Sequence, residues 1–202
     1  LNGTPAAATV AIGSEAGGGL TLKGSGTNTL AGASTYTGAT VVDAGTLMLT
    51  GSLLTGSLSV TNGATFAGTG SASNAAVTVA ANATVAPGTN GVGTLTVGSL
   101  DLKAGAKFAV DFKADGTCDK VVASGALALD GLSLSDFTFS TPADVRAGTQ
   151  VLVDAASVSG ALGANLDGVL IEGQKRIRLA VDAAGGNLLL IVRGKGTLVL
   201  VE

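Results

Sequence analysis

Three aspartates and two lysines crowd one short stretch of this 202-residue chain, and their types could support chemistry. Asp111, Asp115 and Asp119, with Lys113 and Lys120, offer the carboxylates and cations that a polysaccharide-cleaving enzyme uses along a groove. Such a groove normally also offers aromatic platforms, and the chain has only one Tyr and five Phe. The pattern therefore favours solvated loop charges over a catalytic groove.

Metal and general acid–base chemistry find little support in the sequence. The segment DFKADGTCD has the oxygen ligands of a calcium loop, but it has neither the EF-hand spacing nor a nine-residue Gly and Asp repeat. The chain contains no His, which excludes Ser-His-Asp triads and His-ligated metals. We predict no catalytic residue, no cofactor, no metal site and no enzymatic activity.

Two further features have a structural and a functional interpretation. The single Cys118 has no intramolecular partner, so it is either a small half-buried turn residue, which we favour, or the site of an intermolecular disulfide. The segment QKRIR at 174–178 puts Lys175, and with it Arg176 and Arg178, outward on an edge strand, where charge discourages unwanted pairing. A binding patch is the alternative.

Composition indicates an all-β chain. There are 32 Gly, and only 12% of the residues are charged and 3% aromatic, so helix-forming residues are scarce while Val, Thr and turn residues abound. No run of about 18 apolar residues is free of Gly, Ser, Thr or charge. We therefore expect no transmembrane helix and no insertion of this chain into a membrane.

The charge distribution points to an extracellular protein. Residues 1–100 carry only three charges, on Glu15, Lys23 and Asp43, whereas a cytosolic protein normally relies on charge for solubility. The net charge is −3 and no second basic cluster accompanies residues 174–178, so nucleic acid is not an expected partner. The chain lacks an initiating Met and a signal sequence, so we expect a mature or excised fragment of an exported protein.

A short pattern recurs along the chain: an aliphatic residue, two small or polar residues, then Gly or Asn. Because Asn is the residue other than Gly that best tolerates a left-handed backbone, we expect a corner with positive φ at each fourth position. A repeat interval of about 20 residues, with short alternating strands around each corner, is typical of a parallel β-helix. The five copies are Val42-Asp43-Ala44-Gly45, Val60-Thr61-Asn62-Gly63, Val79-Ala80-Ala81-Asn82, Leu102-Lys103-Ala104-Gly105 and Val122-Ala123-Ser124-Gly125.

Aligning the second copy with the third stacks like residues on like. Val60 falls on Val79, Thr65 on Thr84 and Phe66 on Val85, which predicts aliphatic ladders inside and Thr ladders outside. The pair Asn62-Gly63 could instead form a hairpin turn, but it falls on the repeat's corner, and we assign it to the solenoid.

With this repeat identified, the segment NTLAGASTYTGATVVDAGTLMLTG at 28–51 resembles the autotransporter-associated β-strand repeat of bacterial surface proteins. The resemblance covers about residues 20–130, and VAPGTNGVGTLTVGSLDLKAGAKFAVDF is similar to the coil that follows such repeats. It implies a right-handed parallel β-helix in an exported passenger region, and it adds no catalytic residue. From the repeat intervals, each coil should contain about 18–23 residues. The matching residues in the first segment are Gly32, Thr35, Tyr36, Gly38, Thr40, Val42, Gly45, Thr46 and Leu47.

We divide the chain into regular repeats over 1–130 and a less regular β-rich continuation or cap of the same rod over 131–202. The favoured function is a non-catalytic structural protein at the bacterial surface, either a stalk or the subunit of a head-to-tail filament. Its partner would then be itself, through the terminal strands AATVAI (7–12) and GTLVLVE (196–202). The alternative is an adhesin that binds a host or matrix ligand through loops within 134–165, and a polysaccharide-cleaving enzyme ranks last.

Overall fold

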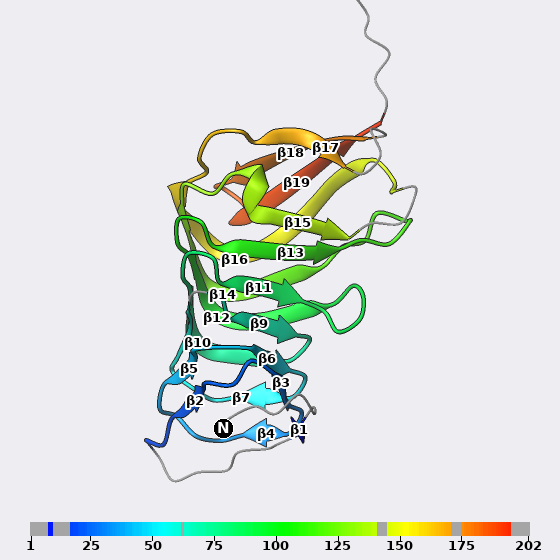
Figure 1. The fold of residues 1–202 in the computed structure, drawn as a ribbon. Helices are drawn as coiled ribbons and strands as arrows, with labels where there is room; N and C mark the ends of the chain where they lie inside the picture. The colour runs from blue at the N-terminus through cyan, green and yellow to red at the C-terminus, as the bar shows by residue number, and fades with distance from the viewer. Residues whose placement is uncertain (1–7, 10–16, 62, 141–144, 171–174, 195–202) are drawn as a thin grey trace, which may run out of the picture.

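The chain folds into a β-solenoid of about five turns (Figure 1). The computed structural model describes residues 8–9, 17–61, 63–140, 145–170 and 175–194. Within these residues the strands form two sheets, and neighbouring strands in most of the stack run parallel. The predicted parallel β-helix is therefore confirmed.

The shorter sheet contains seven strands, each paired in parallel with the next. In spatial order it comprises β1 (Ala8–Thr9), β3 (Thr27–Leu30), β6 (Thr46–Leu49), β9 (Thr65–Gly68), β11 (Thr84–Pro87), β13 (Lys107–Asp111) and β15 (Phe137–Ser140).

The longer sheet starts at the same end of the rod and continues beyond the last coil. It comprises β2 (Leu20–Leu22), β5 (Thr40–Val42), β8 (Ser57–Val60), β10 (Ser71–Val79), β12 (Thr94–Leu102), β14 (Lys120–Asp130), β16 (Gly148–Ala161), β19 (Asn187–Arg193), β18 (Lys175–Asp182) and β17 (Asp167–Leu170). Beside this path, β7 (Ser52–Leu53) pairs with β10, and β4 (Ala33–Ser34) pairs with β7.

Strand register gives the length of each coil. Thr46 pairs with Thr27 on one side and with Thr65 on the other, so these two coils have the same length. Val77 pairs with Leu100, so this later coil is slightly longer, and both separations lie within the predicted range. The coils then lengthen beyond that range, as the pairing of Leu127 with Val158 shows.

Ladders of apolar side chains fill the interior. In the shorter sheet, Leu47, Phe66, Val85 and Phe108 follow one another on successive coils, and all four are buried. Val60 lies beside Val79 and Thr65 beside Thr84, as the alignment of the two copies predicts. Each ladder places buried apolar side chains at the interstrand spacing, so the apolar core repeats coil by coil.

Four of the five predicted corners have the expected backbone. φ is +69° at Gly45, +80° at Gly63, +58° at Asn82 and +76° at Gly105, all in the left-handed region. The strands around Gly63 pair with neighbouring coils and not with each other, so the hairpin alternative for this turn is excluded. Asn62 itself lies outside the described residues.

The fifth predicted corner, at Gly125, is wrong. Gly125 lies inside β14, where the pairing register shifts between Ala123 and Ala126. A bulge in one long strand gives the same sequence pattern as a corner between two short ones, because both favour Gly flanked by alternating residues. The corner of this coil is at Gly131, where φ is +68°.

Antiparallel strands close the C-terminal end of the described solenoid. β16 pairs in parallel with β14 on one side and antiparallel with β19 on the other. β18 then pairs with β19 and with β17, and Figure 1 shows these three strands lying across the last coil. We call β17, β18 and β19 the cap. Parallel pairing thus continues past residue 130, and the division of the rod at that position stays a prediction.

Helix contributes little to the described chain. Its helical segment is η1 (Leu134–Asp136), a single 3-10 turn before β15. Across the residues with described structure, no helix has the length and apolar character needed to cross a membrane.

Candidate functional site

The three candidate aspartates lie around the loop between β13 and β14. Asp111 ends β13, Asp119 immediately precedes β14, and Asp115 lies in the turn between them. In the described part of the chain, no three Asp, Glu, His or Cys side chains gather closely enough to hold a metal ion. Within the described residues, the proximity of these carboxylates in the sequence therefore does not assemble the three ligands of a metal cluster.

Asp119 is buried and uses both carboxylate oxygens to hold the backbone. Its Oδ1 accepts a hydrogen bond from the Gly93 amide at 2.7 Å, and its Oδ2 accepts one from the Asp111 amide at 2.8 Å. Gly93 belongs to the loop between β11 and β12, so one side chain fastens the loops of two successive coils together. Such a carboxylate satisfies backbone donors that would otherwise be buried without a partner.

Asp115 makes a different, local set of hydrogen bonds. Its Oδ1 accepts from the Thr117 amide at 2.8 Å and from the Thr117 hydroxyl at 2.6 Å. These hydrogen bonds lower the pKa of this exposed carboxyl below its ordinary value. Asp115 therefore stabilises the shape of the turn.

A shallow hollow of about 300 Å³ adjoins Asp111 and Asp119 on the outer face of the shorter sheet. Its wall is formed mainly by small or apolar residues, including Met48, Ala67 and Ala86. No aromatic side chain is among the described residues that line it. The hollow thus lacks the stacking surface that the polysaccharide-cleaving hypothesis requires.

We expect Asp119 to make folding stability depend on pH. Burial raises its pKa to about 6 in the folded chain, although the two backbone hydrogen bonds act to lower it. Because the folded pKa exceeds the unfolded value of 3.8, its stabilising contribution is complete below pH 3.8 and is lost as the pH rises through 6. The change is of the order of 3 kcal/mol in the free energy of unfolding.

Urea unfolding of wild type and Asp119→Asn between pH 4 and 7 measures this dependence. The difference in unfolding free energy between the two proteins should change across this range, because the variant lacks the titrating group. Asp115→Asn is the control, since the lowered pKa of Asp115 places its titration at more acidic pH. A difference that stays constant from pH 4 to 7 for Asp119→Asn would contradict the assignment.

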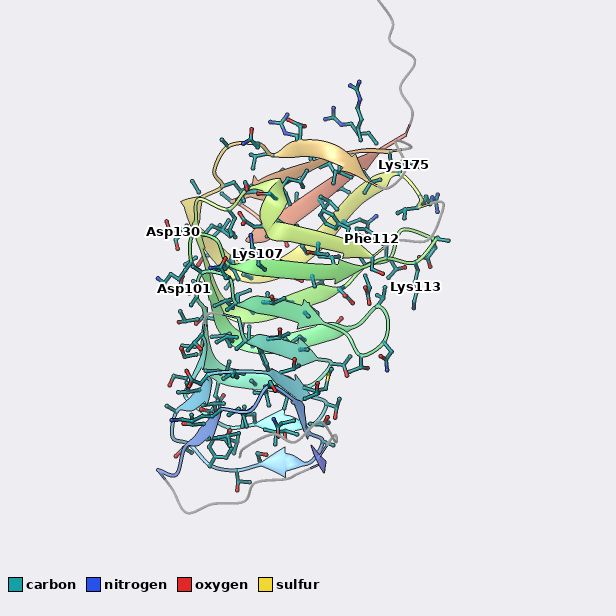
Figure 2. The ribbon with its side chains drawn as sticks, viewed as in Figure 1. Asp101, Lys107, Phe112, Lys113, Asp130 and Lys175 are labelled. Atoms are coloured by element: carbon teal, nitrogen blue, oxygen red, sulfur yellow. The ribbon has the colours of Figure 1, made fainter. Side chains whose placement is uncertain are left out.

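The lysines near this loop serve surface or structural contacts. Lys113 projects from the loop into solvent (Figure 2), and Lys120 lies 4.0 Å from Asp154 on the next coil. A further contact, which sequence reasoning missed, joins Lys107 Nζ to Asp136 Oδ1 at 2.7 Å. These partners lie one long coil apart in the chain, and no local sequence pattern relates them.

Cys118 is a half-buried free thiol, as the favoured interpretation expects. Its backbone bridges to Phe112 across the loop. Burial, and then the neighbouring Asp119 charge, raise the pKa of the thiol to about 12. The side chain is therefore protonated at neutral pH, which makes it a poor nucleophile and does not favour a disulfide between chains.

The basic segment does not lie on an edge strand, so that explanation of its charges is wrong. Lys175, Arg176 and Arg178 belong to β18, which pairs with β17 on one side and β19 on the other. Edge protection requires a strand with an unpaired side, and β18 lies between the strands that precede and follow it in the chain. Figure 2 places Lys175 at the cap end of the rod.

Polar motif residues of the N-terminal coils have structural roles. Tyr36 is buried, and its hydroxyl lies 2.8 Å from the Thr40 hydroxyl, which satisfies both groups inside the core. One coil later, the Thr55 hydroxyl lies 2.5 Å from the Gly38 carbonyl and 2.8 Å from the Ser57 carbonyl, which share its single proton. The contact between Thr55 and Gly38 joins neighbouring coils, whereas the Tyr36–Thr40 pair lies within one coil. The stacked coils define a β-solenoid repeat protein.

Residues 20–52 match the family model of the passenger-associated-transport-repeat. This match and the solenoid together correspond to an autotransporter passenger β-helix repeat protein, which agrees with the resemblance in the sequence. The repeat implies a secreted or cell-surface location. No curated protein matches the chain significantly.

Proposed function

We propose that this chain is a non-catalytic structural segment of an exported passenger-type protein, a β-solenoid rod that serves as a stalk or as a filament subunit. The observation that carries the proposal is the continuity of the stack. Apolar ladders run from coil to coil, and the buried polar side chains of Asp119, Tyr36 and Thr55 fasten one segment of backbone or core to another. These side chains therefore use their hydrogen bonds to stabilise the solenoid.

The passenger-associated repeat at residues 20–52 supports the same proposal, because such a repeat suggests a non-enzymatic domain. The carboxylates that could act on a glycan are dispersed or engaged by backbone amides. On this basis we propose that the chain is not an enzyme.

Self-association is the finer part of the proposal. Among the described strands, β1 of the segment AATVAI ends the shorter sheet at the N-terminal side of the rod and pairs with β3. A strand paired on one side is a template for another chain, and a head-to-tail contact would propagate without closing. AATVAI is described only at Ala8–Thr9 and GTLVLVE lies outside the described residues, so the contact is proposed at the first coil, which contains β1 and β2.

Negative-stain electron microscopy across a concentration series tests this part. We expect unbranched fibres one rod wide from wild type and their loss in Thr21→Lys, which places a charge on the outward face of β2. Ser59→Lys is the matched control, because Ser59 stands in the same column two coils further along. If wild type forms dispersed rods at every concentration, this would contradict polymerisation, and a stalk would remain as the proposed structural role.

An adhesin is the second candidate, and the structure changes where its binding loops would lie. Residues 137–140 and 148–161 are strands, so the segment 134–165 is mostly part of the two sheets and not the loop source that the sequence indicates. The loops between β11 and β12 and between β13 and β14 project from the same side of the rod (Figure 1). A host or matrix ligand would therefore be sought at these loops.

A further inference from the structure

Three arginines meet on the outer face of the cap. Along β18, Ile177 and Leu179 are buried while Arg176 and Arg178 are exposed, as expected of a strand that covers a core with one face. The same alternation along β19 leaves Arg193 exposed. Because Arg176 and Arg193 are register partners in adjacent antiparallel strands, their side chains leave the sheet on the same side.

The arginines line a hollow of about 360 Å³. Its walls also include Asp167 and Gly168 of β17, and Ile177 contributes between the two arginines of β18. Asp167 is the register partner of Arg178, so the one carboxylate in the lining is placed opposite one of the three guanidinium groups. Three positive charges against one negative charge leave a net charge of +2 around the hollow.

Folding alone does not account for this arrangement. Like charges directly opposite on neighbouring strands destabilise a sheet, and Arg176 and Arg193 are such a pair. β18 has a strand on each side, so its arginines do not protect an edge. The ion pairs between described residues have Lys103, Lys107 and Lys120 as their cations. None of these ion pairs includes Arg176, Arg178 or Arg193.

We propose that the outer face of the cap binds a phosphate monoester through Arg176, Arg178 and Arg193. Guanidinium groups present a planar fork of donors that matches phosphate oxygens bidentately, and a phosphate monoester carries a charge of about −1.5 to −2 near neutral pH, which complements the net +2 of the hollow. A volume of about 360 Å³ lies at the small end of ligand sites and leaves room for the group that bears the phosphate.

Two probes distinguish the source of the phosphate. Calorimetric titration with glucose 6-phosphate, with glucose as the neutral control, tests a soluble sugar phosphate. Co-sedimentation with phosphatidylcholine vesicles, with and without phosphatidic acid, tests a lipid headgroup. Binding of either phosphate-bearing probe, above its control, supports the proposal and names the source. Binding of neither, or equal binding of the neutral controls, would overturn it.

Substitutions then locate the site. Arg176→Gln and Arg193→Gln, on different strands, should each weaken binding about ten- to a hundredfold, the loss expected for one charge-assisted hydrogen-bonding group. Arg146→Gln removes the same charge from an exposed arginine outside the hollow and should leave affinity unchanged. Equal weakening by all three variants would show diffuse electrostatic attraction and overturn the site.

A stability measurement separates binding from a structural role. Without ligand, Arg176→Gln should unfold at the same temperature as wild type or a higher one, because it relieves the repulsion with Arg193. A clear fall in the unfolding temperature would assign Arg176 to the fold and contradict the proposal.

Discussion

Replacing Phe66 with Ala should lower the free energy of unfolding by about 3–5 kcal/mol. Phe66 has no exposed surface, and it lies between Leu47 and Val85 in the interior ladder of the shorter sheet. Removing the ring leaves a cavity that the neighbouring coils cannot fill, because their hydrogen bonds fix the spacing between strands. The loss therefore includes both the transfer of the ring from water and the cavity it leaves.

Urea denaturation of Phe66→Ala and of Thr65→Ala measures this effect. Thr65 precedes Phe66 in β9 and alternates to the outer face, so its truncation should cost less than about 1 kcal/mol. The slope of unfolding free energy with urea must be compared as well, since separate melting of coils would change it. Equal losses in the two variants would show that the interior ladder does not dominate stability.

Gly45→Ala should be the most damaging of the corner substitutions. φ at Gly45 is +69°, and a Cβ atom there would overlap the carbonyl oxygens of Gly24 and Gly26 on the preceding coil. The Gly26 carbonyl accepts the Thr46 amide at 3.0 Å, so relief of the overlap disturbs a hydrogen bond between coils. We expect a loss of about 3 kcal/mol, from roughly 1–2 for the left-handed backbone and 1–3 for overpacking.

Gly63→Ala is the matched control for this corner. φ at Gly63 is +80°, yet a Cβ atom there meets no atom within 4 Å. Only the backbone cost of about 1–2 kcal/mol should remain. Thermal or urea unfolding of the two variants separates the two contributions, and identical losses would show that contact between coils at Gly45 is unimportant.

The sequence by itself determined the solenoid and much of its register. Val60 beside Val79 and Phe66 beside Val85 follow from aligning one copy of the repeat with the next, and the left-handed corners at Gly45 and Asn82 follow from the repeat itself. These features were predictable because each coil packs on the next at a nearly constant separation in the chain. The requirement for like residues therefore reappears in the sequence as a repeat.

Only the tertiary structure decided what happens where the repeat lapses. Gly125 proved to lie in a bulge of a long strand, and the carboxylate of Asp119 proved to join two loops. Arg193 lies beside Arg176 because β18 and β19 pair antiparallel at the end of the rod. The physical reason is that bulges, buried hydrogen bonds and antiparallel pairing depend on which backbone groups and strand edges the assembled coils leave available, and no fixed spacing in the sequence encodes that choice.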